Sequence, residues 1–219
     1  MQETIIITDP PYGIDIVNGS NVGITANVGF GKVGVKGLVK AREYSKIIGD
    51  DKPFDPSFLL KLASKVILWG ANNYASKLPD NAHWIVWDKK VEKGADHNNF
   101  SDCELAWTNI KQKSVRVYRY LWSGLLREGD RKDELKARGH PTQKPVGLMV
   151  DIINDYSKPN DIVLDLFLGS GATLIACHKT NRSCYGIELD PKWVDVIIQR
   201  WVDFTENRNI KKNGEKILW

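Results

Sequence analysis

Ile5-Ile6-Ile7-Thr8-Asp9-Pro10-Pro11-Tyr12-Gly13 decides the fold of this 219-residue chain. Its three adjacent β-branched isoleucines favour a strand that is buried on both faces, and the two prolines prevent the strand from continuing. Asp9 therefore lies at the carboxyl end of the predicted strand, which is the edge where ligands bind in an open α/β sheet. Proline fixes its own φ and restricts the residue before it, so the turn presents Asp9 and Tyr12 on a stiff support.

The remainder of the chain alternates predicted strands with predicted helices, which indicates βαβ crossovers and a largely parallel sheet. Further strands are predicted at residues 66–69, 84–87, 100–107, 115–122, 161–166 and 184–189. Helices are predicted to begin at Asp55-Pro56, with Phe58, Leu59 and Leu62 buried, at 71–77, at 146–156, after a glycine turn at 169–171, and at Asp190-Pro191. The last helix is expected to bury Val194, Ile197, Ile198, Trp201 and Thr205, and a turn is expected at Asn213-Gly214.

The composition indicates one domain. With 42% apolar residues the chain can bury one substantial core but is short for two, so we expect residues 1–219 to form a single catalytic domain with an insertion. The three cysteines form no Cys-x-x-Cys pair and the four histidines form no ligand cluster, which predicts a reduced intracellular compartment and no metal site. No stretch approaches the roughly 18 apolar residues that span a bilayer, so we expect a soluble, cytoplasmic protein without a membrane partner.

The positive charge is concentrated in the segment 111–138. This segment holds nine Lys/Arg and four acids, a net charge of +5, whereas the whole chain carries +4. A near-neutral body with one basic segment predicts a local contact with a polyanion such as DNA. Within it, 115–122 alternates apolar and basic residues, as in a strand with one packed face and one face towards phosphates. A solvated antiparallel edge strand is the alternative. The candidate DNA-binding residues are Lys111, Lys113, Arg116, Arg119, Tyr120, Arg127, Arg131 and Lys132.

A glycine-rich segment follows the first turn. Residues 13–37 contain seven glycines with three asparagines between them, and so many residues without a β-carbon are costly to order. We interpret 13–37 as a mobile loop that closes over the site as a lid, because a closing loop must be hinged beside the chemistry. The alternative is a disordered connection without a role.

A strand, Gly169-Ser170-Gly171, a helix, a second strand and then Glu188 form a pattern typical of nucleotide binding. The two glycines allow close approach of a ligand, and Glu188 can accept hydrogen bonds from both ribose hydroxyls. The three-glycine fingerprint of dinucleotide sites is absent because Thr173 and Leu174 follow Ala172. The pattern therefore favours a compact nucleoside ligand such as S-adenosylmethionine over NAD.

Three motifs resemble those of amino-group DNA methyltransferases of the β type. They are Asp9-Pro10-Pro11-Tyr12, the cofactor motif 165–171 and the ribose-binding strand 186–190, and residues 140–145 resemble the segment that precedes the cofactor motif. The catalytic motif comes first, target recognition second and the cofactor motif third. This is the order of the circularly permuted β arrangement. Residues 69–74, 84–89 and 100–108 are similar to phage-associated members. The resemblance implies a Rossmann-like methyltransferase fold with a seven-stranded, mostly parallel sheet, in which the Asp9 and Asp165 strands are neighbours, and a target-recognition segment at 111–138.

The resemblance also implies roles for single residues. Asp9 and the Pro10 carbonyl would accept the two N–H groups of the target amine, Pro11 would stiffen the turn, and Tyr12 would stack on the base. Leu166 and Ala172 depart from the proline and threonine of many relatives, and His140 has no assigned role. Alternatively, Glu188 is an ordinary exposed acid at the end of a strand, and Lys144 is a surface lysine at the start of a helix. The implied cofactor-binding residues are Asp165, Phe167, Gly169, Gly171, Glu188, Thr142 and Lys144.

The implied function is methylation of N6 of an adenine flipped out of double-stranded DNA, with S-adenosylmethionine as donor and no metal. A stacked base is out of reach, so the target must be extruded. Cytosine N4 methylation is the runner-up, since members that act there more often have serine in place of Asp9. RNA or protein methylation, and a DNA-binding protein with a decayed site, are further alternatives. The resemblance is compatible with a homodimer.

Overall fold

The computed structural model describes residues 2–15, 46–81, 83–90, 101–111, 114–123, 126–127 and 143–219. The predicted lid at 13–37 lies outside this part of the chain from residue 16 onwards. Within the described ranges, none of the helices has both the length and the apolar character required to cross a membrane.

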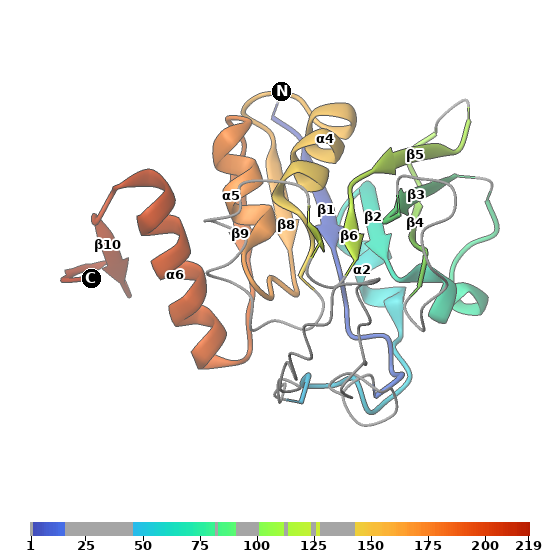
Figure 1. The fold of residues 1–219 in the computed structure, drawn as a ribbon, viewed down its shortest axis with the longest axis horizontal. Coiled ribbons are helices and arrows are strands. Elements are labelled where there is room, and N and C mark those ends of the chain that lie inside the picture. The colour runs from blue at the N-terminus through green and yellow to red at the C-terminus, as the bar shows by residue number, and fades with distance from the viewer. Residues whose placement is uncertain are drawn as a thin grey trace, which may run out of the picture.

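Seven strands form one sheet in the order β5-β3-β4-β2-β1-β8-β9 (Figure 1). β1 lies in the middle and pairs in parallel with β2 on one side and β8 on the other. β9 is parallel to β8 and β5 is parallel to β3, whereas β4 runs antiparallel to both of its neighbours. The strands are β1 (Thr4–Thr8), β2 (Lys65–Trp69), β3 (Trp84–Asp88), β4 (Cys103–Thr108), β5 (Arg116–Arg119), β8 (Ile162–Asp165) and β9 (Ser183–Gly186). This confirms the predicted Rossmann-like α/β fold and its mostly parallel sheet.

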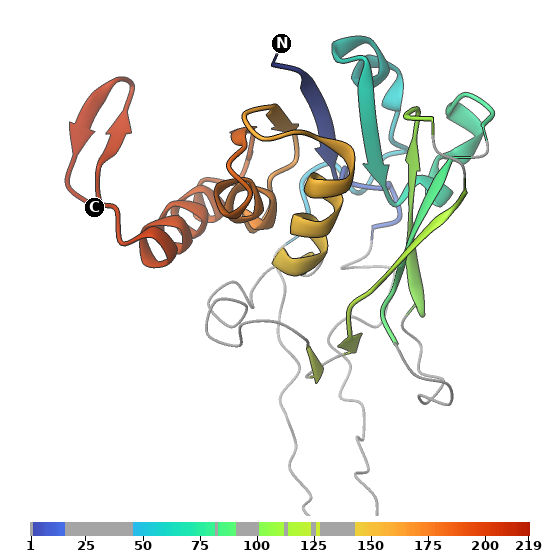
Figure 2. The same ribbon diagram turned by 90° about the horizontal axis from the view of Figure 1, so that it is seen from above.

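Both faces of β1 are buried, as its isoleucines predict. Ile5 and Ile7 pack in one cluster with α4 (Val146–Tyr156) and α5 (Ala172–Lys179), which lie side by side on one face of the sheet (Figures 1 and 2). Ile6 points the other way and packs with Leu59 and Tyr74, from short helical turns on the opposite face. Those turns are η1 (Pro56–Phe58), α2 (Leu59–Leu62), η2 (Ala71–Asn73) and η3 (Ala75–Lys77). The sheet is therefore the middle layer of three.

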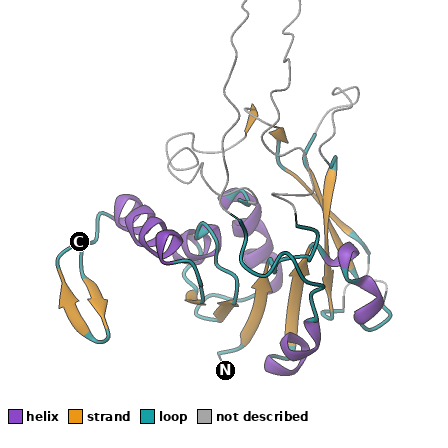
Figure 3. Ribbon diagram, turned by 90° about the horizontal axis from the view of Figure 1, so that it is seen from below, coloured by secondary structure: helices purple, strands orange, loops and turns teal. Residues whose placement is uncertain are grey.

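The last part of the chain leads away from the sheet. Asp190 caps α6 (Pro191–Thr205) by accepting a hydrogen bond from the Lys192 N–H, as the Asp-Pro pair predicts. Beyond α6, β10 (Ile210–Lys212) and β11 (Glu215–Ile217) form a hairpin at the end of the molecule opposite to β5 (Figure 3). Its turn is Asn213-Gly214, as predicted, and both residues have positive φ. A second small pair is β6 (Trp122–Ser123) with β7 (Leu126–Arg127).

Several details of the predicted elements are wrong. The helix expected after Asp55 is a short 3-10 turn followed by four α-helical residues, which is too short for a buried stripe, so Phe58 and Leu62 are about half exposed and only Leu59 is buried. The helix expected at 71–77 is two 3-10 turns. In α6 the buried residues are Ile197, Arg200 and Val202, because α6 meets the rest of the chain through Ser170, Gly171 and α5.

The predicted strand 115–122 also differs from expectation. Only Arg116–Arg119 forms β5, and its packed side chain is aromatic: Tyr118 packs against the core, followed by Tyr120 and Trp122 beyond the strand. Val115 and Val117, which were expected on the packed side, are 50% and 46% exposed. The segment therefore does not separate apolar from basic residues. β5 lies at the edge of the sheet, as the edge-strand alternative has it, but it is parallel to β3 and not antiparallel.

Replacing Ile6 with alanine tests the centre of the fold. Ile6 is fully buried, so removal of its side chain leaves a cavity, and we expect the free energy of unfolding to fall by about 2–5 kcal/mol in a urea titration. The control, Leu62→Ala, removes a side chain that is 56% exposed and should change the same quantity by less than about 0.5 kcal/mol. Equal losses in the two variants would contradict the central position of β1.

Candidate active site

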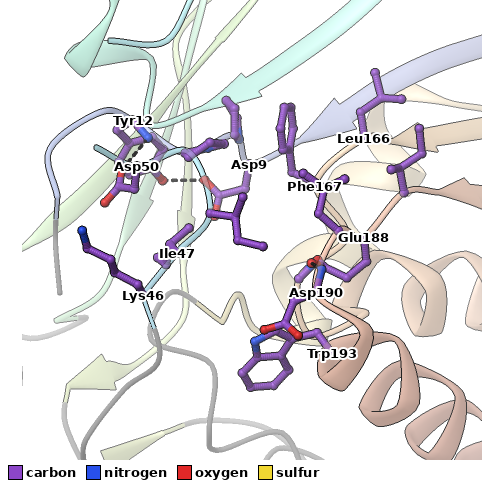
Figure 4. Close-up of a pocket in the computed structure, with 16 residues that line it drawn as sticks. Asp9, Tyr12, Lys46, Ile47, Asp50, Leu166, Phe167, Glu188, Asp190 and Trp193 are labelled. Atoms are coloured by element: carbon purple, nitrogen blue, oxygen red, sulfur yellow. Dashed lines mark hydrogen bonds between the residues drawn. The ribbon is translucent and has the colours of Figure 1, made fainter. Parts of the chain in front are cut away.

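The four residues predicted as catalytic and three of the seven predicted to bind a cofactor line one pocket at the carboxyl ends of β1, β8 and β9. Figure 4 shows Asp9 and Tyr12 on one side of this pocket, and Glu188, Asp190 and Trp193 on the other. Pro10, Pro11, Phe167 and Gly169 also line it, together with Lys46, Ile47, Ile48, Asp50, Leu166, Ile187 and Leu189. A smaller cavity next to it shares Asp9, Phe167 and Gly169 and is lined also by Lys144, Asp165 and Thr173.

Both carboxylate oxygens of Asp9 have partners. The Tyr12 hydroxyl donates to Oδ1 at 2.5 Å (Figure 4), and the Lys144 ammonium forms an ion pair with Oδ2. Burial raises the pKa of Asp9, although the charge of Lys144 acts in the opposite direction. Burial and the neighbouring Asp9 also raise the pKa of Tyr12, so its hydroxyl stays protonated and donates. Asp9 is thus a hydrogen-bond acceptor held between two donors.

Lys144 is buried, with only 6% of its side chain exposed, so the alternative of a surface lysine is wrong. Its ammonium pairs with Asp9 and, at 2.9 Å, with Glu104 of β4, and it lies 5.4 Å from the centre of the Trp69 ring. Burial alone would lower the pKa of Lys144, but Asp9 and Glu104 outweigh it and raise the pKa. Burial would raise the pKa of Glu104, but Lys144 and Lys89 hold that pKa at about 2. The sequence predictions contained Lys144 but missed Glu104.

The shape of the turn that carries Tyr12 depends on a buried carboxylate, Asp50. One oxygen of Asp50 accepts from the backbone N–H groups of Tyr12 and Gly13, both at 3.0 Å, and from that of Ile14 at 3.4 Å. Gly13 has φ +77°, and a β-carbon there would meet the Lys52 carbonyl oxygen at 2.4 Å. Asp50 lies in a polar stretch without a motif, so nothing in the sequence marked it.

Gly70, which follows β2, leaves the space that the Tyr12 ring occupies. A β-carbon on Gly70 would lie 1.9 Å from a ring carbon of Tyr12, and the glycine has φ +65°. The Tyr12 ring therefore lies directly on the backbone of residue 70, a contact that only glycine permits.

Asp165 organises the start of the glycine turn. Its carboxylate accepts from the hydroxyls of Thr8 at 2.7 Å and Thr173 at 2.5 Å, and from the Phe167 N–H at 3.2 Å. Burial raises the pKa of Asp165 to about 6, although these three donors act in the opposite direction. Asp165 thus links β1, β8 and α5, and it lines the smaller cavity.

Glu188 closes the glycine turn onto the end of β9. Its two oxygens accept from the N–H groups of Gly169 at 2.8 Å and Asp190 at 2.9 Å, while its side chain lines the pocket. Gly171 lines neither cavity; a β-carbon there would lie 3.2 Å from the Ile197 side chain of α6. Arg200 of α6, which is buried, donates to the Ser170 carbonyl at 2.9 Å. Sequence reasoning missed this arginine because it expected an apolar stripe.

Among the basic candidates of 111–138 whose side chains are described, none lines the pocket. Lys111 and Arg116 are exposed, and Arg119 lies 3.6 Å from Asp88 in an exposed ion pair. Tyr120 packs against Gly147 of α4 and donates to Asp151 at 2.5 Å. Lys113, Arg131, Lys132 and Thr142 lie outside the described residues, and of Arg127 only its place in β7 is described. Their DNA or cofactor contacts stay predictions.

Comparison with known proteins identifies the family. Residues 44–200, which are more than half of the chain, match the family described as DNA methylase, whose model covers N6 and N4 enzymes. The chain belongs to the DNA methylase family. It is 35% identical over 132 residues to the type II methyltransferase M.HinfI of Haemophilus influenzae, covering 59% of this chain and 35% of that protein. It is 30% identical over 125 residues to the type II methyltransferase M2.MboI of Moraxella bovis, covering 57% and 42%.

The chain spans less than half of the length of these two curated relatives. Among solved structures, the PvuII DNA methyltransferase, which is cytosine-N4-specific, is similar in fold, with a TM-score of 0.54 and 15% identity over 96% of this chain and 82% of that one. The family and the fold of the chain therefore agree with the resemblance in its motifs.

Replacing Asp50 with alanine should destabilise the protein. The variant leaves the N–H groups of residues 12–14 without their buried acceptor, and we expect the free energy of unfolding to fall by about 1–3 kcal/mol in urea. Asp51→Ala is the matched control, because Asp51 is exposed, and should change it by less than about 0.5 kcal/mol. A loss in both variants alike would show that the acceptor role of Asp50 is wrong.

Asp165 should make stability depend on pH. The pKa of Asp165 is about 6 in the folded protein, and we take 3.8 for the unfolded chain. Between these two pH values the folded protein therefore binds a proton on Asp165 more tightly than the unfolded chain does. Its stabilisation is therefore present below about pH 4 and is lost as pH rises through 6, by up to about 3 kcal/mol. Asp165→Asn has no such proton, and urea titrations from pH 4 to 7 should show the wild type losing stability relative to the variant. A difference that is constant with pH would refute this.

Proposed function

We propose that the chain is a DNA methyltransferase that transfers the methyl group of S-adenosylmethionine to N6 of an adenine flipped out of double-stranded DNA. The observation that carries the proposal is the shared pocket of the Asp9–Tyr12 turn and the Gly169–Glu188 pair. The family membership supports the chemistry, and the names of the type II relatives support a place in restriction and modification.

The chemistry requires an acceptor beside the target amine. An exocyclic amine on a purine ring has a delocalised lone pair and is a weak nucleophile. Asp9 would accept one of its N–H groups and the Pro10 carbonyl the other, which favours a pyramidal nitrogen with its lone pair free. Each oxygen of Asp9 has one donor and can accept a second hydrogen bond, so the amine can bind beside the Tyr12 hydroxyl on the pocket side or take its place.

The side chains of the pocket suit an adenosine-like cofactor. Glu188 presents a carboxylate that ribose hydroxyls can reach, and Ile187, Leu189 and Trp193 provide an apolar wall next to it. Ile187 and Leu189 are 51% and 65% exposed, which is unusual for such residues unless a ligand covers them. The cofactor's sulfonium supplies an electrophilic methyl group. Phe167 and Gly169 would then lie between the ribose site and Asp9, with Lys144 and Asp165 around the smaller cavity.

Adenine is favoured over cytosine by Asp9, since members that methylate cytosine N4 more often have serine there. The family covers both reactions, and the PvuII enzyme with the similar fold is cytosine-N4-specific, so cytosine N4 is the second candidate. The whole of residues 1–219 would form one methyltransferase domain, with the basic residues of 111–138 as the contact to DNA and a homodimer as a possible assembly.

Incubation of the protein with S-adenosylmethionine and mixed-sequence duplex DNA, followed by digestion and mass spectrometry, tests the proposal. We expect N6-methyldeoxyadenosine, and Asp9→Ala should lower the rate by about 100-fold or more because the amine loses its acceptor. Cofactor affinity, measured by calorimetry, should stay close to that of the wild type.

Asp51→Ala is the control and should keep full activity. N4-methyldeoxycytidine as the product would overturn the adenine assignment, and full activity of Asp9→Ala would overturn the role of Asp9. Cofactor binding without any methylated nucleoside would exclude this DNA substrate.

A further inference from the structure

We propose that Glu104 is a positioning residue for methyl transfer: it shares Lys144 with Asp9 and so keeps the Asp9 carboxylate available to the target amine. The inference rests on the proposed function, because it concerns the same carboxylate. Glu104 lies in the stretch 100–108, which resembles phage-associated members, but the resemblance assigns it no role.

The direction of β4 explains how Glu104 reaches the site. β4 runs antiparallel to β2 and β3, so its first residues lie at the edge of the sheet where the parallel strands end. Glu104 is the second residue of β4 and is opposite Trp87, next to the end of β3. Lys144 approaches the same edge directly before Pro145, the N-cap of α4. Two segments far apart in the sequence thus meet beside Asp9.

The contacts form a chain of alternating charge. Lys89 pairs with one oxygen of Glu104 at 2.5 Å, Lys144 pairs with the other at 2.9 Å, and Lys144 also pairs with Asp9. The exposed fraction of the side chain is 17% for Lys89, 23% for Glu104, 6% for Lys144 and 17% for Asp9. Two carboxylates and two ammonium groups balance, which a largely buried cluster requires. Removal of the Glu104 charge would leave one positive charge without a partner.

The balance matters for the chemistry at Asp9. A buried ammonium with a single anionic partner concentrates its hydrogen bonds and its charge on that partner. With Glu104 in place, Lys144 divides its donors between two carboxylates, and Asp9 retains acceptor capacity for an amine. Without Glu104, Lys144 would bind Asp9 alone and would compete with the amine for it. Glu104 therefore acts on the reaction through Lys144 and touches neither base nor cofactor.

The proposal has a consequence for pH that a purely structural role lacks. The groups around Asp9 are Tyr12 of its own turn, Lys144 before α4, Glu104 of β4, Asp165 of β8 and Tyr74 after η2. The negative charge of Glu104 raises the pKa of Asp9, so its removal lowers that pKa. In a plot of kcat against pH, activity falls at low pH as Asp9 becomes protonated. This acid limb should therefore move to lower pH in a variant without the Glu104 charge, even though kcat itself falls.

The test compares Glu104→Gln with the wild type in DNA methylation between pH 4 and 9. We expect kcat to fall by about tenfold, which corresponds to about 1.4 kcal/mol in the barrier, with cofactor affinity retained and the acid limb at lower pH. Glu104→Asp keeps the charge with a shorter reach, so it should lower kcat and leave the limb in place. Glu3→Gln is the matched control, since Glu3 forms an ion pair with Lys65 at the opposite edge of the sheet and should change neither quantity.

A second measurement does not depend on activity. Carbon NMR of labelled aspartate, assigned with Asp9→Asn, should show that Asp9 titrates at lower pH in Glu104→Gln than in the wild type. An unchanged Asp9 titration, or an acid limb that moves equally in Glu104→Asp, would overturn the proposal. If the wild type methylates no DNA, the proposed function fails, whereas the NMR result still decides whether Glu104 acts on Asp9.

Discussion

The parallel pairing of β1 with both β2 and β8 is the constraint on which the site depends. Parallel neighbours end at the same edge, so Asp9, Gly70 and Asp165 come together although more than 150 residues separate the first from the last. The hydrogen bond from the Thr8 hydroxyl to Asp165 fixes this register at the edge itself. A shift of one residue would exchange the faces of Ile5, Ile6 and Ile7, so that two isoleucines would enter the cluster that now holds only Ile6 of the three.

A second layer of order comes from buried charge. Each carboxylate at the edge has a distinct set of donors: backbone N–H groups for Asp50 and Glu188, hydroxyls for Asp165, and ammonium groups for Glu104. A buried charge is tolerated only when such partners are present, so these contacts hold the loops in one arrangement. Asp9 differs from the others in that one of its donors is the hydroxyl of a residue on its own turn, which makes it the carboxylate whose partner can be exchanged with the least rearrangement.

Features that depend on adjacent residues can be predicted from the sequence, whereas features that depend on tertiary contacts cannot. The end of β1 at the proline turn, the cap of α6 and the glycine turn depend on adjacent residues, and they were predicted correctly. Glu104 depends on the antiparallel direction of β4, Asp50 on how the chain returns to the turn, and Arg200 on where α6 packs. None of these three has a signal in its own segment, because tertiary contacts define its role. The prediction for the packing of β5 was wrong for the same reason. Both faces of this segment are partly apolar, so its alternation does not indicate which face packs against a helix.

The contact between Tyr12 and Gly70 has a consequence for motion. A glycine offers a flat peptide surface, so the ring resting on it meets no β-carbon that would catch it as it turns or slides. The Tyr12 hydroxyl is held by its hydrogen bond to Asp9 and the ring packs against the Ile6 cluster, whereas Asp50 holds the backbone at residues 12–14. Rotation of the Tyr12 ring would therefore leave the backbone of the turn in place and would change only the donor to one oxygen of Asp9.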